Sequence, residues 1–140
     1  MKIKRISKIV ISLFCLATLV LGCCSCSSSP KDFTGKWTVT DVSFSNSAFA
    51  DEIQLLALET TYKEMTLQLN EDKSGSLYYL NKDNQITWEL KDGKHWDTIN
   101  IYMDGVLWKE FEVTDENNIW LTLETDIVIA SVSFSKGENS

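Results

Sequence analysis

The chain has little proline, glycine or histidine, and no cysteine beyond its first 26 residues. Its 140 residues hold one proline (Pro30), six glycines and one histidine (His95). This composition excludes collagen-like and low-complexity chains. With a single histidine and no thiol after Cys26, the main body has no ligand set for a transition metal and no Cys-His pair for nucleophilic catalysis. We therefore expect no metal and no cofactor.

Sequence signatures of catalysis are missing as well. No serine stands in a Gly-x-Ser-x-Gly context, and there is no glycine-rich phosphate-binding loop. Carboxylates are plentiful, which leaves an acid/base pair open. However, Glu110 and Glu112 fall on outward positions of a predicted strand, and Asp115-Glu116 and Glu71-Asp72 lie in predicted turns. Solvated acids are the simpler interpretation. The lone His95, next to Trp96, is typical of a surface turn, so we expect a protein that is not an enzyme.

The first 22 residues contain no acidic side chain and no hydrophobic run long enough for a membrane span. Residues 1–8 carry four basic groups, and the next fourteen residues, Ile9–Gly22, are uncharged. At about 1.5 Å per residue, a helix of this length falls short of the roughly 30 Å hydrocarbon core of a bilayer. A basic start followed by a short apolar run predicts a secretory signal peptide over residues 1–22.

The rest of the chain is strongly acidic. Residues 23–140 hold 9 basic and 20 acidic side chains, a net charge of −11 compared with −7 for the whole sequence. Such a charge is a poor match to nucleic-acid phosphates, so we expect no nucleic-acid partner. It also disfavours tight docking on anionic lipid headgroups.

The end of the apolar run resembles a known processing signal. Val20-Leu21-Gly22-Cys23 is similar to the lipobox of bacterial lipoproteins, with an aliphatic residue, a small residue and then the cysteine. The resemblance implies that Cys23 is diacylated with palmitate-type chains and becomes the mature N-terminus. It also implies an outer-membrane lipoprotein in the envelope of a Gram-negative bacterium, on the periplasmic face or at the cell surface. An ordinary signal peptide with coincidental cysteines is the alternative.

The sequence then divides into a tether and one domain. Residues 23–32 are small and polar, include Pro30, and predict a flexible tether. Cys24 and Cys26 could be free, modified or paired with each other, and their spacing does not decide among these states. Residues 33–140 are long enough for one domain with one core. That domain contains no cysteine, so its fold needs no disulfide.

Alternation of apolar and polar residues dominates the domain and predicts eight short strands joined by polar turns. A helix is expected over residues 48–59, between the first two strands, with Ser47 as its cap and an apolar stripe of Phe49, Ile53 and Leu56. Short turns between consecutive strands predict an all-β antiparallel meander, either a closed barrel or a sandwich. The predicted strands are 37–44, 65–70, 76–80, 86–90, 98–103, 107–113, 119–123 and 127–134.

Two motifs resemble a family. Gly35-Lys36-Trp37 opens the first strand as in lipocalin-like proteins, and residues 86–93 (ITWELKDG) are similar to the central segment of lipocalin-like lipoproteins from Bacteroidetes-type bacteria. The resemblance implies an eight-stranded up-and-down barrel in which Gly35 lets the chain turn and Trp37 packs across the closed end. Two features depart from the pattern. Many lipocalins place an arginine near the end of the last strand, where it stacks on the first-strand tryptophan. No arginine follows Arg5 here, so Lys136 is the only cation near that position. The helix position is closer to that of fatty-acid-binding barrels.

The interior positions of such a barrel suggest a ligand pocket. An eight-stranded barrel is just wide enough to be filled by side chains or to hold one small ligand. The leading hypothesis is non-catalytic binding of a small hydrophobic or amphipathic ligand, and ordinary core packing is the alternative. The candidate pocket residues are four inward aromatic residues and the stripe of the helix: Trp37, Tyr79, Trp88, Phe111, Phe49, Ile53 and Leu56.

Outward aromatic residues suggest a second, competing function. Large aromatic side chains on solvent positions are typical of a surface that meets a protein partner, a glycan or a second copy. On this hypothesis the protein is a structural or interaction lipoprotein with a filled barrel. A register error or cover by the helix would also explain the pattern. The candidate patch residues are Tyr78, Tyr102, Trp108 and Trp120.

Overall fold

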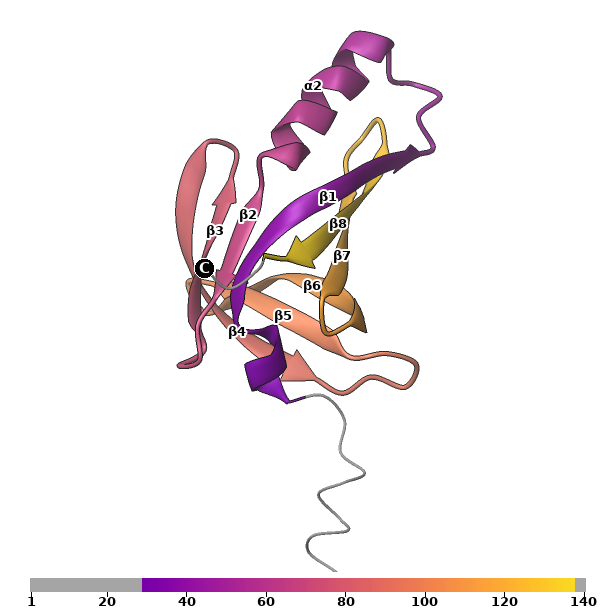
Figure 1. Ribbon diagram of the computed structural model, residues 1–140. Coiled ribbons are helices and arrows are strands. Elements are labelled where there is room, and N and C mark those ends of the chain that lie inside the picture. Colours follow the sequence, from indigo (N-terminus) through magenta and orange to yellow (C-terminus); the bar gives the residue numbers. More distant parts are fainter. Residues whose placement is uncertain (1–28, 138–140) are drawn as a thin grey trace, which may run out of the picture.

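Eight antiparallel strands close into a barrel in the computed structural model, which describes residues 29–137 (Figure 1). Each strand pairs with the next along the chain, and β1 pairs with β8 to complete the ring. The predicted all-β barrel with one helix between its first two strands is confirmed. The strands are β1 (Gly35–Ser45), β2 (Thr66–Leu69), β3 (Ser74–Tyr79), β4 (Lys82–Lys91), β5 (Thr98–Met103), β6 (Val106–Asp115), β7 (Asn118–Glu124) and β8 (Ile129–Lys136).

Two short helical elements accompany the barrel. They are the 3₁₀ turn η1 (Pro30–Phe33) and the helix α2 (Glu52–Lys63). The helix begins four residues later than the predicted start, because Asp51 and not Ser47 caps it. The Asp51 carboxylate accepts a 2.8 Å hydrogen bond from the Gln54 backbone N–H, and the Gln54 side chain accepts one from the Asp51 N–H. This reciprocal capping box determines where the helix starts.

The up-and-down order of the strands separates the connections into two groups. The connections after β1, β3, β5 and β7 lie at one end of the barrel, which we call the α2 end because α2 belongs to the first of them. The connections after β2, β4 and β6 lie at the opposite end together with η1, and we call this the η1 end. Figure 1 shows α2 at the top and η1 at the bottom of the molecule.

The inward positions of the strands form the core. Alternate residues are buried along β2, β7 and β8, as the period of two in a pleated strand requires. The inner face of β8, which the sequence left open, carries Ala130, Val132 and Phe134. Alternation predicts which side chains point inward, and of these the following are at most 5% exposed: Trp37, Met65, Leu67, Leu69, Leu77, Ile86, Trp88, Ile99, Ile101, Phe111, Ile119, Leu121 and Leu123. The other predicted inward residues are partly buried and pack against this core: Val39, Tyr79, Leu90, Met103 and Val113.

The η1 end is closed by residues of η1 and of the start of β1. Phe33 and Trp37 are fully buried and their rings stack. Gly35 between them has φ +124°, a conformation that side chains rarely adopt, so the predicted turn into the barrel depends on glycine. The Lys136 Nζ donates a 2.7 Å hydrogen bond to the Asp32 carbonyl. The last residues of the predicted flexible tether, Pro30–Asp32, therefore form part of a turn that is attached to the barrel.

The predicted signal peptide and the cysteines Cys23, Cys24 and Cys26 lie outside the described residues. Within residues 29–137, no helix has both the length and the apolar character needed to cross a bilayer.

Candidate functional site at the α2 end of the barrel

Three of the predicted pocket residues are packed inside the barrel. Trp37, Trp88 and Phe111 are 0–2% exposed. The Trp88 indole Nε1 donates a 3.0 Å hydrogen bond to the Asn70 carbonyl, and the Lys73 ammonium lies 4.2 Å from the centroid of its ring. The Trp37 indole donates to the Phe33 carbonyl in the same way. Because both indole N–H groups have backbone partners, the two tryptophans are ordinary core residues. Neither of the two cavities described below is lined by them.

An aromatic ladder runs from α2 into the core. Tyr62 of α2 stacks on Tyr79 of β3 with ring centroids 6.4 Å apart, and Tyr79 lies 5.8 Å from Trp108 of β6. The ladder continues to Phe111 at 6.5 Å and then to Phe134 at 5.4 Å. Such contacts add about 0.5–1.5 kcal/mol per pair beyond area burial. The ladder attaches the last turn of α2 to the barrel.

The inward position of Trp108 corrects the sequence prediction. Ile101 of β5 is opposite Lys109, while Tyr102 is opposite Leu107, so Trp108 has no partner on the neighbouring strand. One extra residue on β6 forms a β-bulge, which changes the side to which the following side chains point. Trp108 consequently packs against Tyr79 and the core, and its predicted outward position was wrong.

The other three residues of the predicted patch are half-buried on the barrel wall and do not form one surface. Tyr78, Tyr102 and Trp120 belong to β3, β5 and β7, and no described ring contact joins any two of them. The Tyr102 hydroxyl donates to the Glu89 carboxylate of β4. This hydrogen bond is the main reason why the pKa of Glu89 is lowered.

Two tyrosines of the ladder have perturbed acidities. Burial raises the pKa of Tyr79, and burial together with the charge of an ionised Tyr79 raises the pKa of Tyr62. Both hydroxyls stay protonated at neutral pH, so neither offers a base there. Within residues 29–137, no group of three or more His, Cys, Asp or Glu side chains is placed to hold a metal ion.

The predicted apolar stripe of the helix does not cover the barrel. Phe49, Ile53 and Leu56 are 85%, 80% and 64% exposed. Because α2 starts at Glu52, Phe49 lies before the helix, and the side packed against the barrel carries Leu58 and Tyr62 instead. The prediction that the stripe lies over a pocket was wrong for Ile53 and Leu56, which line neither of the hollows described below. The helix has apolar residues on two faces, and only one of them is packed.

Further exposed apolar residues lie at the same end. Leu80 belongs to the β3–β4 turn and is 62% exposed, while Val106 and Leu107 follow the β5–β6 turn at 69% and 44%. None of these three residues is among the predicted site residues. Exposure of Val106 could have been predicted from its place directly after the Asp104-Gly105 turn, where no neighbouring segment covers the side chain. We call Phe49, Ile53, Leu56, Leu80, Val106 and Leu107 the α2-end apolar surface.

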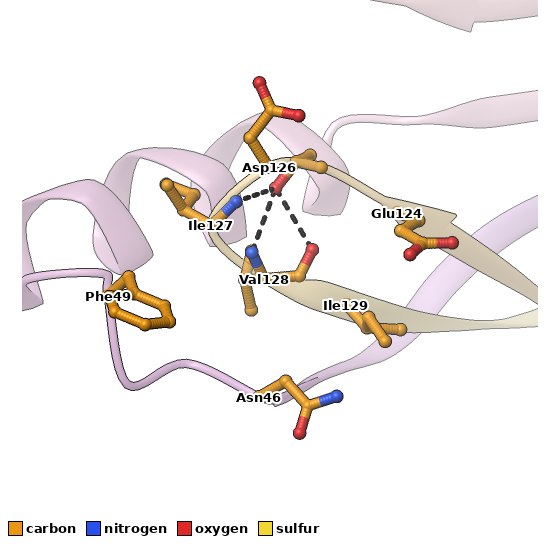
Figure 2. Close-up of a pocket in the computed structure, with 8 residues that line it drawn as sticks. Asn46, Phe49, Glu124, Asp126, Ile127, Val128 and Ile129 are labelled. Atoms are coloured by element: carbon orange, nitrogen blue, oxygen red, sulfur yellow. Dashed lines mark hydrogen bonds between the residues drawn. The ribbon is translucent and has the colours of Figure 1, made fainter.

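Two hollows lie next to this surface. The first, of about 230 Å³, lies between the β1–α2 connection at Asn46 and Phe49 and the β7–β8 turn, residues 124–129 (Figure 2). Its turn is rigid, because the Thr125 Oγ1 accepts from the Val128 N–H at 3.2 Å and donates to the Val128 carbonyl at 3.0 Å. The second, of about 210 Å³, lies between residues 82–85 and Met103-Asp104. Both are smaller than the roughly 300–1,000 Å³ of ordinary small-molecule sites.

Comparison with known proteins adds one structural similarity. No protein-family model matches the chain, and no curated protein matches it at a significant level. The structure is similar to the crystal structure of a DUF4847 family protein from Bacteroides vulgatus, at 15% sequence identity and a TM-score of 0.46. The similarity covers 77% of this chain and 96% of the other.

Proposed function

We propose that this protein is a lipid-anchored, non-catalytic binding protein of the cell envelope that holds an amphipathic molecule at the α2 end of its barrel. One observation carries the proposal. Of the seven large hydrophobic side chains that are exposed in residues 29–137, six lie at the α2 end, and Trp96 alone lies at the η1 end. Exposed apolar side chains gathered at one end of a domain are a feature of interaction sites.

The filled interior favours the outer end over the inside of the barrel as the binding site. Trp37 and Phe111 have no exposed surface, and Trp88 has almost none. A ligand inside the barrel would have to displace close-packed side chains, which is costly. The barrel is then a rigid support for the α2 end. This arrangement combines the binding hypothesis with its competitor, a filled barrel that acts through its surface.

The positions of the two ends support the envelope assignment. The chain enters the barrel through η1, and the α2-end apolar surface lies at the opposite end (Figure 1). An acylated Cys23, as the lipobox resemblance implies, would hold the η1 end toward the bilayer. The α2 end would then face away from the membrane and be free to bind. The Gly35-x-Trp37 start and the eight strands support kinship with lipocalin-like lipoproteins.

Photolabelling tests where binding occurs. The full chain in phosphatidylcholine nanodiscs is irradiated with a long-chain alcohol that carries a diazirine, and adducts are mapped by peptide mass spectrometry. We expect adducts on α2 and on the β5–β6 hairpin, at Ile53, Leu56 and Leu107, which excess unlabelled alcohol prevents. Saturation by the competitor separates binding from partition into the lipid.

A matched pair of variants provides the control. Ile53→Ser with Leu56→Ser removes exposed apolar area at the α2 end, and Trp96→Ser removes it at the η1 end. Only the first variant should lose labelling. Adducts at Trp88 or Phe111 would show that the ligand binds inside the barrel. If excess unlabelled alcohol prevents no labelling, binding is refuted altogether.

The lipid anchor has its own test. Cells that express the full chain are fed an alkyne analogue of palmitate, and the purified protein is examined for incorporated label. Cys23→Ala should abolish labelling, whereas Cys26→Ala should leave it unchanged. Label that persists in Cys23→Ala would contradict the lipobox assignment.

A further inference from the structure

Charge is distributed unequally between the two ends of the barrel. The connections at the α2 end, residues 46–64, 79–83, 103–107 and 124–128, carry eight carboxylates and two lysines. The connections at the η1 end, residues 29–36, 70–74, 91–98, 115–118 and 136–137, carry seven carboxylates and six lysines. The η1 end is therefore close to neutral, and most of the negative charge of the connections belongs to the α2 end.

Few cations offset the charge of the α2 end. Lys63 forms an ion pair with Glu59 on the neighbouring turn of the helix. Lys82 is the other lysine of these connections. Seven of the eight carboxylates are exposed, and Glu59 is half-buried. A cluster of one sign raises the local concentration of ions of the opposite sign and accelerates their arrival.

Carboxylates and residues of the α2-end apolar surface belong to the same connections. Glu52 directly precedes Ile53, and Asp104 lies two residues before Val106. Glu124 and Asp126 line the first hollow together with Phe49, and Figure 2 shows both carboxylates on the β7–β8 side of that hollow. An occupant of this end thus meets apolar side chains and carboxylates within the same surface.

We propose that the occupant is an amphipathic polypeptide segment with a cationic polar face, an inference that rests on the binding function proposed above. The carboxylates of the α2 end attract lysine or arginine, and the α2-end apolar surface favours contact with aliphatic or aromatic side chains. The extent of the α2-end apolar surface favours a polypeptide, because its residues come from α2 and from two separate turns. A small molecule fills one hollow, whereas a short amphipathic helix spans several contact points at spacings of three and four residues.

Peptide binding to the full chain in phosphatidylcholine nanodiscs tests the proposal. The probe is a fluorescent peptide of about fifteen residues with leucine on one helical face and lysine on the other. The comparison peptide has glutamate in place of lysine, and empty nanodiscs measure binding to lipid alone. We expect the lysine peptide to bind at least about tenfold more tightly than the glutamate peptide. Its affinity should fall as salt is raised, because exposed charges are screened.

Two pairs of variants localise the effect. Asp104→Asn with Asp126→Asn should weaken binding of the lysine peptide and flatten its salt dependence, whereas Glu71→Gln with Asp92→Asn removes two charges at the η1 end and should change nothing. Ile53→Ser with Leu56→Ser should weaken binding, while Trp96→Ser should not. All seven substituted side chains are exposed, so the thermal unfolding of each of the four variants should match that of the parent.

The outcomes separate this inference from the binding function itself. If the photoactivatable alcohol labels α2 but the two peptides bind equally, the cationic partner is refuted and binding at the α2 end stands. If the η1-end charge variant weakens the lysine peptide as much as the α2-end variant, the attraction is a property of the whole acidic domain and the proposed site is refuted. If neither the alcohol nor the peptide binds, both proposals fail.

Discussion

The indole Nε1 of Trp37 donates a 2.9 Å hydrogen bond to the carbonyl oxygen of Phe33, and the two rings stack with centroids 6.4 Å apart. This pair attaches η1 to the first strand and closes the η1 end of the barrel. Both side chains are fully buried. The carbonyl would be left without this donor if the indole were removed, and an unpaired buried polar group is costly.

Trp37→Phe is therefore expected to lower the free energy of unfolding by about 1–3 kcal/mol, through the lost hydrogen bond and the space left by the smaller ring. Urea denaturation followed by circular dichroism measures the change. Trp96→Phe is the control, because Trp96 is 53% exposed and should tolerate the same substitution. Equal effects of the two substitutions would contradict the closing role of Trp37.

The tyrosines of the aromatic ladder predict a loss of stability at high pH. Burial raises the pKa of Tyr62 and of Tyr79 above the ordinary value of about 10, so the folded protein keeps both protons after the unfolded chain has lost them. Their contribution is complete below pH 10 or so and decreases as the pH rises toward the folded pKa. The measurement is the free energy of unfolding as a function of pH. Tyr79→Phe should make the alkaline decline shallower, and an unchanged decline would refute the assignment.

The β-bulge of β6 predicts that Trp108 stabilises the fold. Its ring fills the gap between Tyr79 and Phe111 in the ladder. Trp108→Ala is expected to cost about 2–3 kcal/mol, less than the 3–5 kcal/mol typical of a fully buried aromatic, because the ring is partly exposed. Val106→Ala, at an exposed position of the same strand, should change stability by less than about 0.5 kcal/mol. A cost for Trp108→Ala near that of Val106→Ala would place Trp108 on the outside.

Gly75 is expected to be intolerant of any side chain. A Cβ atom at this position would lie 2.1 Å from the Gln68 carbonyl oxygen on the neighbouring strand, which is backbone and cannot rotate away. Gly105, with φ +77°, has open space around it, so Gly105→Ala should cost only the roughly 1 kcal/mol of an unfavourable backbone conformation. Gly75→Ala should cost clearly more. Thermal unfolding of the two variants measures the difference, and equal melting temperatures would contradict it.

The strand pattern could be predicted from the sequence because alternation in a half-buried strand is local. Each turn of polar residues marks a reversal, and the inward residues of β2 and β7 follow directly from their period of two. The side to which Trp108 points could not be predicted in this way, since the bulge depends on how β6 aligns with β5. Register across strands is set by tertiary packing and is invisible to a pattern read along one segment.

The start of α2 and its packed face were mispredicted for a different reason. The helix is apolar on two sides, so Phe49, Ile53 and Leu56 formed a stripe as regular as the one that is buried. The reciprocal pair Asp51 and Gln54 was a local signal that would have placed the start of the helix correctly. The proposed binding surface includes the exposed stripe, and only the structure distinguishes the exposed stripe from the packed one.

Closure of the barrel by β1 and β8 has a consequence for the order of folding. The hydrogen bond from Lys136 to Asp32 joins positions 104 residues apart, and β1 pairs with β8 over most of its length. Contacts between such distant parts of the chain slow folding, so closure should take milliseconds to seconds (order of magnitude) and not microseconds. Until the last strand is delivered, one edge of β1 has no partner. During synthesis the chain must therefore be kept from pairing that edge with a neighbouring molecule.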